Sequence, residues 1–375
     1  MERDPSPSPR LLLGPGPSMV HPRVLQAMAT PLLGHLDPEF LSVLADIRAM
    51  LRAVFQTQND LTLAISGTGT AAMEAALSNL IEPGDPMLAC IQGYFGERLA
   101  EMGGRYGAQV ARLEVPWGEV QDPSAIDASL AARPAKLVTL VHAETSTGAL
   151  QPEIAEIAAA CHRHGALLVL DVVTSLGGLP VEIDAWDVDL AYSAGQKSLS
   201  APPGLSPITV GDRARAAMAR RSSSPVVFYF DLQLLGQYWS DRPVYHHTAP
   251  ISTAFGLRAA LRLAVEEGLP ARFKRHAANA RLLWDGLERL DLPLLVPEPI
   301  RLPTLSTPRL PGTFDEAEIR RRLLLEQSIE IAGGFGPLAG KVWRIGLMGE
   351  SSRSENVQRL LTALEDSMRG AVRRA

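Results

Sequence analysis

The amino-acid sequence predicts an α/β protein, with a mostly parallel central sheet in a large domain and a smaller C-terminal α+β domain. Three observations lead to this prediction. Short apolar runs alternate with amphipathic helical patterns up to residue 210, and strand patterns become sparse beyond residue 212. The chain also has 375 residues, which is long enough for two domains with a sizeable core.

The N-terminal part supplies the elements of the predicted sheet. Residues 1–10, MERDPSPSPR, are rich in Pro and Ser and predict a disordered tail, which we extend to residue 15. Residues 38–56 then show helical apolar spacing. Seven apolar runs predict strands: LTLAI (61–65), MLACI (87–91), VARLEV (110–115), KLVTLVHA (136–143), ALLVLDVV (166–173), VDLAYS (188–193) and SPITV (206–210). Helical patterns at 71–80, 95–103 and 154–164 lie between them, an alternation typical of a parallel sheet covered on both faces.

The C-terminal part mixes helices and strands. Residues 213–223 predict a basic, solvated helix, and residues 251–290 a long helical pattern broken at 268–270. After it come RLPTLSTPRL (301–310), EAEIRRRLLLEQ (316–327), KVWRIGLM (341–348) and a final helix to about residue 369. We therefore place a large domain at residues 16–270 and a small domain at 271–375, with a boundary somewhere between 265 and 295.

Composition excludes several classes of partner. The net charge of −5 leaves no basic excess to bind nucleic acid or an acidic membrane, and no apolar run approaches the length of a membrane span. The two cysteines, Cys90 and Cys161, lie in apolar segments and predict buried free thiols in a reducing compartment. We therefore expect a cytoplasmic protein.

A Gly-rich turn provides the first candidate site. In ISGTGTAAMEAAL (65–77) a strand ends, the turn follows and a helix begins, so backbone N–H groups and the hydroxyls of Thr68 and Thr70 could hold a phosphate. The pattern also fits the G-x-G-x-x-A of a dinucleotide fold. That fold requires an acidic residue after the next strand, whereas here the strand ends on Gln92 and Glu97 lies inside the following helix. A phosphate ligand other than a dinucleotide is therefore preferred.

Two charged residues lie at the ends of predicted strands. Asp171 ends a buried strand, where a carboxylate is costly unless it is paired or caps the next turn. Lys197 lies in SAGQKSLSAPPG (193–204), a loop of small residues in which a lone lysine is by default solvent-exposed. Both would open onto the same sheet edge as the Gly-rich turn. An amine that can form a Schiff base, a carboxylate for a pyridinium nitrogen and a phosphate cradle are together what pyridoxal phosphate requires.

The sequence resembles the class V aminotransferases of fold type I, and in particular the alanine–glyoxylate and serine–pyruvate group. The resemblance extends from about residue 11 to residue 364. The segments that carry it are GPGPS, FQTQNDLTLAISGTGTAAMEAAL, HAETSTG, DVVTSLGG, YSAGQK, APPG, YHHT and GKVWRIGLMG.

The resemblance implies pyridoxal 5′-phosphate as cofactor and a role for each matching residue. Lys197 would form the Schiff base, and Asp171 would bind the pyridine nitrogen. The other implied cofactor contacts are Thr68, Gly69, Thr70 and Gln196 at the phosphate, Phe95 and Val173 on the two ring faces, and Thr145 near the ring hydroxyl. Tyr245 and Thr248 would reach the phosphate of the neighbouring subunit, which implies a homodimer with shared active sites. Arg344, helped by backbone near Gly16, would bind the substrate carboxylate.

The predicted activity is transfer of an amino group from a small amino acid, alanine or serine, to glyoxylate or pyruvate. The apolar surroundings of Lys197 should lower its pKa, so that it acts as nucleophile and general base. A single candidate carboxylate-binding arginine suggests a monocarboxylic substrate. The alternatives are an (S)-ureidoglycine–glyoxylate aminotransferase and, in a different class, an NAD-dependent dehydrogenase. We expect no metal site, because the C-x-x-H pair Cys161 and His164 has no further ligands nearby.

Overall fold

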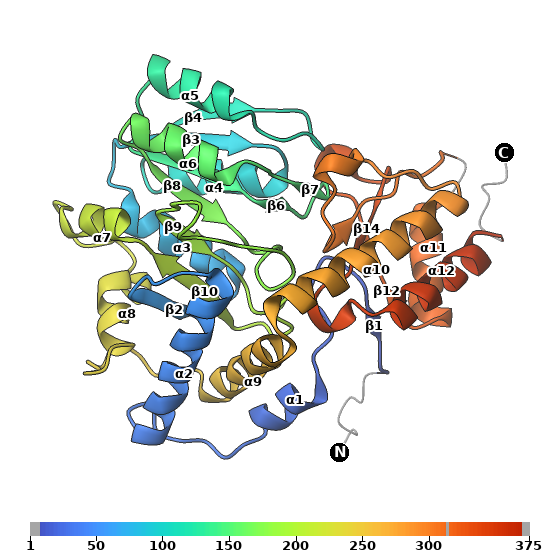
Figure 1. Ribbon diagram of the computed structural model, residues 1–375, viewed down its shortest axis with the longest axis horizontal. Helices are drawn as coiled ribbons and strands as arrows, with labels where there is room; N and C mark the ends of the chain where they lie inside the picture. Colours follow the sequence, from blue (N-terminus) through green and yellow to red (C-terminus); the bar gives the residue numbers. More distant parts are fainter. Residues whose placement is uncertain (1–7, 313–314, 370–375) are drawn as a thin grey trace.

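The computed structural model describes residues 8–312 and 315–369 and consists of a large α/β body and a smaller C-terminal body (Figure 1). Most of the predicted N-terminal tail, residues 1–7, lies outside the described residues. In Figure 1 the C-terminal elements, coloured orange and red, gather on one side of the molecule together with the N-terminal strand.

The large body is built on a seven-stranded sheet within the described residues. In spatial order its strands are β2 (Leu61–Ser66), β10 (Leu205–Val210), β9 (Leu190–Tyr192), β8 (Leu167–Asp171), β5 (Leu137–Val141), β3 (Pro86–Ile91) and β4 (Gln109–Glu114). β10 runs antiparallel to both β2 and β9, and the other neighbouring pairs are parallel. Each strand corresponds to one of the predicted apolar runs, so the prediction of a mostly parallel sheet is confirmed.

Helices connect these strands. They are α1 (Pro22–Met28), α2 (Pro38–Phe55), α3 (Gly69–Leu80), α4 (Tyr94–Arg105), α5 (Pro123–Ala132), α6 (Ile154–Arg163), α7 (Asp212–Ala219), α8 (Leu232–Tyr238) and α9 (Ile251–Glu267). Helix α2 buries one face, with apolar residues at helical spacing: Phe40, Leu44, Ile47 and Leu51. Asp37 caps its first turn by accepting a hydrogen bond from the Glu39 N–H (2.8 Å). Helices α1, α5 and α8 are not predicted by the apolar pattern. α1 and α8 have only seven residues each, and α5 buries only Ile126 and Leu130, so the apolar periodicity is too weak to recognise.

The C-terminal body has its own hydrophobic core. It contains α10 (Leu269–Arg289), α11 (Glu316–Glu326), α12 (Ser354–Met368) and a sheet of β11 (Leu305–Ser306), β14 (Trp343–Gly346) and β13 (Ala332–Gly333). β1 (Leu11–Leu12) pairs in parallel with β12 (Ile329–Glu330), and Leu11 and Leu13 are buried in this core. The end of the predicted tail is therefore a folded strand, too short for its pattern to be recognised in the sequence.

Helix α10 connects the two bodies. Near its start, Arg272 donates to the carbonyl oxygens of Gly177 (2.7 Å) and Ser198 (2.6 Å) in the large body. Further along, Leu283 and Leu287 belong to the C-terminal core. A division at residue 270 agrees with the start of this helix but stays a prediction.

Short elements complete the chain. A hairpin consists of β6 (Ala143–Glu144) and β7 (Ala149–Leu150), and the short 3-10 helices are η1 (Phe228–Phe230), η2 (Glu298–Ile300), η3 (Gly336–Leu338) and η4 (Gly349–Ser351). Cys90 and Cys161 are buried free thiols, as predicted, and burial raises the pKa of Cys161 to about 12. In the described part of the chain, no helix has the length and apolar character that a membrane span requires.

A buried histidine links α10 to η4. The Nδ1 atom of His276 lies 2.8 Å from the Arg272 carbonyl oxygen and must donate to it, so Nε2 is free to accept from the Gly349 N–H (2.9 Å). Both bonds require the neutral ring. Burial, reinforced by the charge of Arg272, lowers the pKa of His276 to about 3. Burial likewise lowers the pKa values of His142 and His247 to about 4.

These histidines predict a loss of stability in acid. An unfolded histidine titrates near pH ~6.5. Below that pH, down to the native pKa, the unfolded chain binds more protons, so the free energy of unfolding falls as pH falls. The limiting slope is about 1.4 kcal/mol per pH unit for each such histidine. Urea unfolding is measured between pH 7.5 and 4.5 for the parent and for His276→Gln. The free energy of unfolding of the variant should fall less steeply with pH; equal slopes in the two proteins would contradict the prediction.

Candidate active site

Nine of the residues predicted to bind the cofactor line one cavity of about 180 Å³. They are Thr68, Gly69, Thr70, Phe95, Thr145, Asp171, Val173, Gln196 and Lys197. The cavity lies where β2, β5, β8 and β9 end, because its lining residues occupy or closely follow the carboxyl ends of these strands. The expectation that the strand ends would bring these side chains together is met, as the rule for open α/β sheets requires.

The Gly-rich turn forms an anion cradle at the start of α3. Thr68 caps the helix from an extended conformation and makes no side-chain capping bond. Gly67 has a φ of +147°, and a Cβ there would lie 2.5 Å from the Ala71 Cβ. A Cβ on Gly69 would lie 3.1 Å from the Ala194 Cβ. Glycine at both positions therefore lets the helix start approach the cavity, where its N–H groups suit a phosphate.

Asp171 is buried and oriented by two donors. Its Oδ1 accepts from the Val173 N–H (2.8 Å), and its Oδ2 accepts from the Tyr192 hydroxyl (2.8 Å). Burial raises the pKa of Asp171 to about 6, and these two hydrogen bonds and the positive charge of Lys197 limit the rise. Near neutral pH the group is therefore mainly a carboxylate, ready to pair with a cation.

Lys197 faces the N-terminal loop. Its Nζ donates to the Pro15 carbonyl oxygen, and its own carbonyl oxygen accepts from the Ser18 hydroxyl (2.7 Å). Gly16, with a φ of +116°, passes so close that a Cβ there would lie 2.9 Å from the Lys197 Cδ. Burial lowers the pKa of Lys197 to about 8, opposed by Asp171 and assisted by Arg344, as the apolar loop predicted. The neutral amine is therefore more populated near neutral pH than that of an ordinary lysine.

The first turn of α4 is held by the hairpin of β6 and β7. Glu144 Oε2 accepts from the Phe95 N–H (3.2 Å), and the Ser146 hydroxyl accepts from the Tyr94 N–H (3.0 Å). Gly93 leaves no room for a side chain, since a Cβ would lie 2.5 Å from the Glu144 Cγ. This arrangement places Phe95 against the cavity, whereas Tyr94 does not line it.

Arg344 is a buried cation on β14. Its Nε donates to the Gly333 carbonyl oxygen (2.7 Å), and its Cζ lies 3.7 Å from the ring centroid of Phe335. Among the described residues no carboxylate lies within ion-pair distance of it. Burial lowers the pKa of Arg344 to about 10, and the charge of Glu144 opposes this shift. A guanidinium in this state suits a carboxylate ligand.

The predicted cofactor contacts at Tyr245 and Thr248 lie outside this cavity. Both side chains are exposed in the single chain. The histidines between them are buried, and His247 Nε2 lies 2.9 Å from the Ser66 hydroxyl at the end of β2. The loop is therefore anchored beside the Gly-rich turn while Tyr245 and Thr248 face outward.

Sequence reasoning missed four groups around the site. Arg98 lines the cavity and donates to the Thr70 hydroxyl (3.4 Å), Tyr192 binds Asp171, Glu144 holds α4, and the Pro15 carbonyl binds Lys197. Tyr192 could have been found, since it ends the strand next to the one that ends on Asp171. Arg98 could not have been recognised as a site residue from the sequence, because it is one of many arginines in amphipathic helices.

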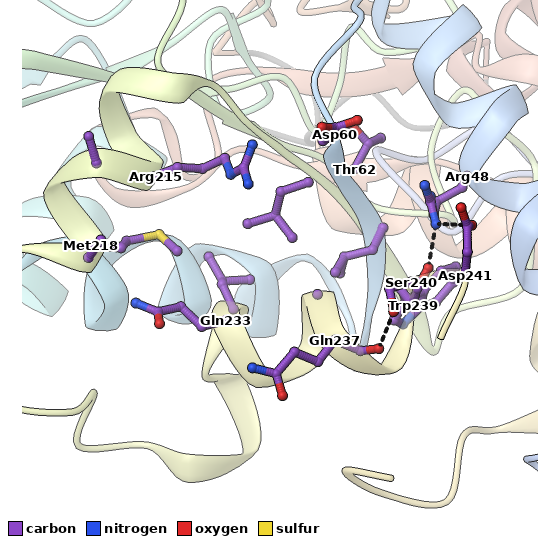
Figure 2. A pocket seen from close by; sticks show the side chains of 16 residues that line it. Arg48, Asp60, Thr62, Arg215, Met218, Gln233, Gln237, Trp239, Ser240 and Asp241 are labelled. Atoms are coloured by element: carbon purple, nitrogen blue, oxygen red, sulfur yellow. Dashed lines mark hydrogen bonds and ion pairs between the residues drawn. The ribbon is translucent and has the colours of Figure 1, made fainter. Parts of the chain in front are cut away.

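A larger cavity of about 730 Å³ lies elsewhere, between β2, α7 and α8 (Figure 2). Arg48 on its wall donates to the Trp239 carbonyl oxygen (2.6 Å) and lies 3.4 Å from the Asp241 carboxylate. None of the predicted site residues lines it. We place the active site in the smaller cavity because an amine with a lowered pKa and a buried carboxylate converge there.

The smaller cavity fits pyridoxal phosphate. It offers a helix N-terminus for the phosphate, Asp171 for the ring nitrogen, Lys197 for the aldehyde, and apolar Val173 and Phe95 for the ring. Gln196 has a buried side-chain oxygen with no hydrogen-bond partner among the described residues, as expected of a ligand-binding group. Fold and site together define a pyridoxal-phosphate-dependent enzyme of fold type I.

Comparison with known proteins identifies the family. Residues 10–335 match the family described as Aminotransferase class-V. The chain is 43% identical over 363 residues to the alanine–glyoxylate aminotransferase of Oryctolagus cuniculus, covering 96% of this chain and 92% of the relative. It is 40% identical over 374 residues to the (S)-ureidoglycine–glyoxylate transaminase of Bacillus subtilis (strain 168), covering 95% and 90%. A crystal structure of alanine–glyoxylate aminotransferase from Nostoc sp. superposes with a TM-score of 0.96 at 50% identity, covering 98% and 97%.

The chain belongs to the class V aminotransferase family and is a pyridoxal-phosphate-dependent transaminase. The dinucleotide-binding alternative considered for the Gly-rich turn is therefore dropped. The individual roles of the site residues stay predictions, supported by their convergence on one cavity.

Proposed function

We propose that this protein transfers the amino group of a small monocarboxylic amino acid, alanine or serine, to glyoxylate or pyruvate. The observation that carries the proposal is the cavity that is lined by both Lys197, with a pKa of about 8, and the buried Asp171. Arg344, which lacks an acidic partner among the described residues, is close enough to lower the pKa of Lys197. The relatives named for glyoxylate support this choice of acceptor.

The residues of the chain would divide the reaction as follows. Pyridoxal phosphate, when bound, supplies an electron-withdrawing ring conjugated to the substrate. Lys197 would hold the cofactor, and its Nζ, once released, would take the proton from the substrate α-carbon and later return it. Arg344 would bind the substrate carboxylate and so fix which bond faces Lys197. Asp171 would keep its negative charge against the ring nitrogen and favour the protonated form of that nitrogen.

The choice of donor is the least constrained part of the proposal. Arg98 lines the cavity, whereas Arg344 is not among its lining residues, and Arg98 already donates to the Tyr94 hydroxyl (3.2 Å) and the Thr70 hydroxyl (3.4 Å). A second carboxylate would have to compete with these contacts, which favours a monocarboxylic donor. The similarity to the Bacillus subtilis relative makes (S)-ureidoglycine the alternative donor.

The donor can be identified by a spectroscopic half-reaction. The purified holoenzyme is mixed separately with alanine, serine and ureidoglycine, and the visible absorbance of the bound cofactor is followed together with release of the keto acid. We expect the absorbance to be lost with alanine or serine. Loss with ureidoglycine alone would replace the proposal by the alternative, and no loss with any of the three would refute it.

We further propose a homodimer in the cytoplasm. Apolar side chains are exposed on and near the loop that carries Tyr245, namely Leu32, Val226, Phe228, Val244 and Tyr245 itself. A surface of this kind is typical of a subunit interface. Covering it with a second copy would bring Tyr245 and Thr248 toward a neighbouring site. The two buried free thiols fit a reducing compartment.

Subunit complementation tests whether the active sites are shared. Two inactive variants, Lys197→Ala and the double variant Tyr245→Ala/Thr248→Val, are co-expressed with different affinity tags, and the doubly tagged species is assayed. Shared sites predict recovered activity, because one site then has Lys197 from one subunit and Tyr245 and Thr248 from the other. A monomer in analytical ultracentrifugation, or a mixed dimer without activity, would contradict the prediction.

A further inference from the structure

We propose that Tyr94 and Phe335 form an aromatic bridge between the two bodies that positions Arg344 for the substrate carboxylate. This inference rests on the proposed function, because it takes Arg344 as the carboxylate-binding residue. Tyr94 comes from the first turn of α4 in the large body, and Phe335 from the segment between β13 and β14 in the C-terminal body. Their ring centroids lie 4.9 Å apart.

The first step concerns the guanidinium of Arg344. One face lies over the Phe335 ring, with 3.7 Å between Cζ and the ring centroid, and the Nε–H is taken by the Gly333 carbonyl oxygen. The described residues accept no hydrogen bond from its terminal nitrogens. The edge formed by these nitrogens is therefore what remains for a ligand, and such an edge matches the two oxygens of a carboxylate.

The second step concerns what holds Phe335. The ring is 36% exposed and belongs to neither hydrophobic core, so burial does little to fix it. It packs instead on Tyr94, at an interplanar angle of 39°. The adjoining Gly336 adopts a φ of +45° and lies against Trp117, which limits the backbone of this segment.

The third step concerns Tyr94, which is fixed from several sides. Its N–H donates to the Ser146 hydroxyl (3.0 Å), and its hydroxyl accepts from Arg98 Nη2 (3.2 Å). The Cζ of Arg98 lies 5.0 Å from its ring centroid, and the edge-to-face contact with Phe95 has a centroid distance of 5.5 Å. Tyr94 is as exposed as Phe335, but these contacts hold it in place, so it can serve as a support that the cofactor-binding body offers to the C-terminal body.

A chain of contacts results, from the cofactor cavity through Phe95 and Tyr94 to Phe335 and Arg344. Ring-to-ring and cation-to-ring contacts have preferred geometries, so this chain sets direction as well as distance. Without it, the C-terminal body would still fold on its own core, but Arg344 would lose the surface that orients its guanidinium toward the site of Lys197.

The test compares Phe335→Leu and Tyr94→Leu with Tyr94→Phe, which keeps the ring, and with Leu325→Ala, which alters an exposed apolar side chain on α11. Holoenzyme variants are assayed for kcat and KM of the amino donor, and for the Kd of acetate by calorimetry. We expect both leucine variants to raise the KM and the acetate Kd about tenfold. The kcat and the visible absorbance of the bound cofactor should stay near the parent values, as should all properties of Leu325→Ala.

A double variant and an arginine variant complete the design. Tyr94→Leu combined with Phe335→Leu should be no worse than either single change, because both act through one contact. Arg344→Ala serves as the reference for a lost carboxylate site. If Arg344→Ala weakens acetate binding but the leucine variants do not, the bridge is refuted and the proposed function stands. If Arg344→Ala leaves acetate binding unchanged, the substrate site itself is wrong, and the bridge falls with it. An altered cofactor absorbance in the leucine variants would also overturn the proposal, because it would show that Tyr94 acts on the cofactor.

Discussion

Replacing Lys197 with alanine is expected to lower kcat by about 10⁴-fold or more, because the change would remove the amine that we propose both attaches the cofactor and acts as general base. No other described lysine lines the cavity, so no other lysine amine is positioned to bind the cofactor or act as the base in the variant. The phosphate cradle at the start of α3 and Asp171 remain in the variant. Pyridoxal phosphate should therefore still bind, but it should wash out on dialysis.

Borohydride reduction measures the attachment independently of activity. In the parent protein, reduction followed by proteolysis and mass spectrometry should place the pyridoxyl group on the peptide that contains Lys197. The variant should carry none. Lys274→Ala, at an exposed lysine on α10, is the matched control and should behave as the parent in turnover and labelling. Transamination by Lys197→Ala at the parental rate, or a label on a different lysine, would remove the assignment.

The fold was largely predictable because the strands of a parallel sheet are nearly continuous apolar runs. MLACI (87–91) and LLVLD (167–171) illustrate this, since β3 and β8 pair in parallel with both of their neighbours and these residues are buried. What the pattern could not reveal was pairing across long separations. Leu11–Leu12 joins Ile329–Glu330 through only two register positions, and a pair of leucines carries no periodic signal.

The site was predictable where its residues follow strand ends, and not where they come from other elements. Asp171, Lys197 and the Gly-rich turn each follow a strand, so the sheet rule brings them together. Glu144 binds the Phe95 N–H from a hairpin, and the Pro15 carbonyl binds Lys197 from the N-terminal loop; neither residue follows a strand of the main sheet, so the strand-end rule does not predict them. The assignments of Tyr245 and Thr248 depend on a second subunit and stay predictions, as do the domain limits.

Replacing Asp171 is expected to cause the second large fall in kcat. Asp171→Asn keeps the size of the side chain but removes its negative charge, so the ring nitrogen of the cofactor would lose the group that keeps it protonated. We expect kcat to fall by about 10²–10³-fold, the usual cost of removing one electrostatic stabiliser from a buried site. Cofactor binding should persist, since Lys197 and the phosphate cradle are untouched. Asp241→Asn, at an exposed carboxylate, should leave kcat unchanged.

The pH dependence of cofactor binding tests the role of Asp171 more specifically than the size of the fall in kcat does. In the chain without cofactor, burial raises the pKa of Asp171 to about 6, so the carboxylate is lost progressively as pH falls through that value. Binding of pyridoxal phosphate to the parent apoprotein should therefore weaken on the acid side near pH 6, and Asp171→Asn should show a smaller decline because it has no proton to gain there. Tyr192→Phe removes a hydroxyl that stabilises the charged form and should move the decline to higher pH. An Asn variant with the parental acid limb would mean that another group titrates, and the pairing of Asp171 with the cofactor nitrogen would then have to be abandoned.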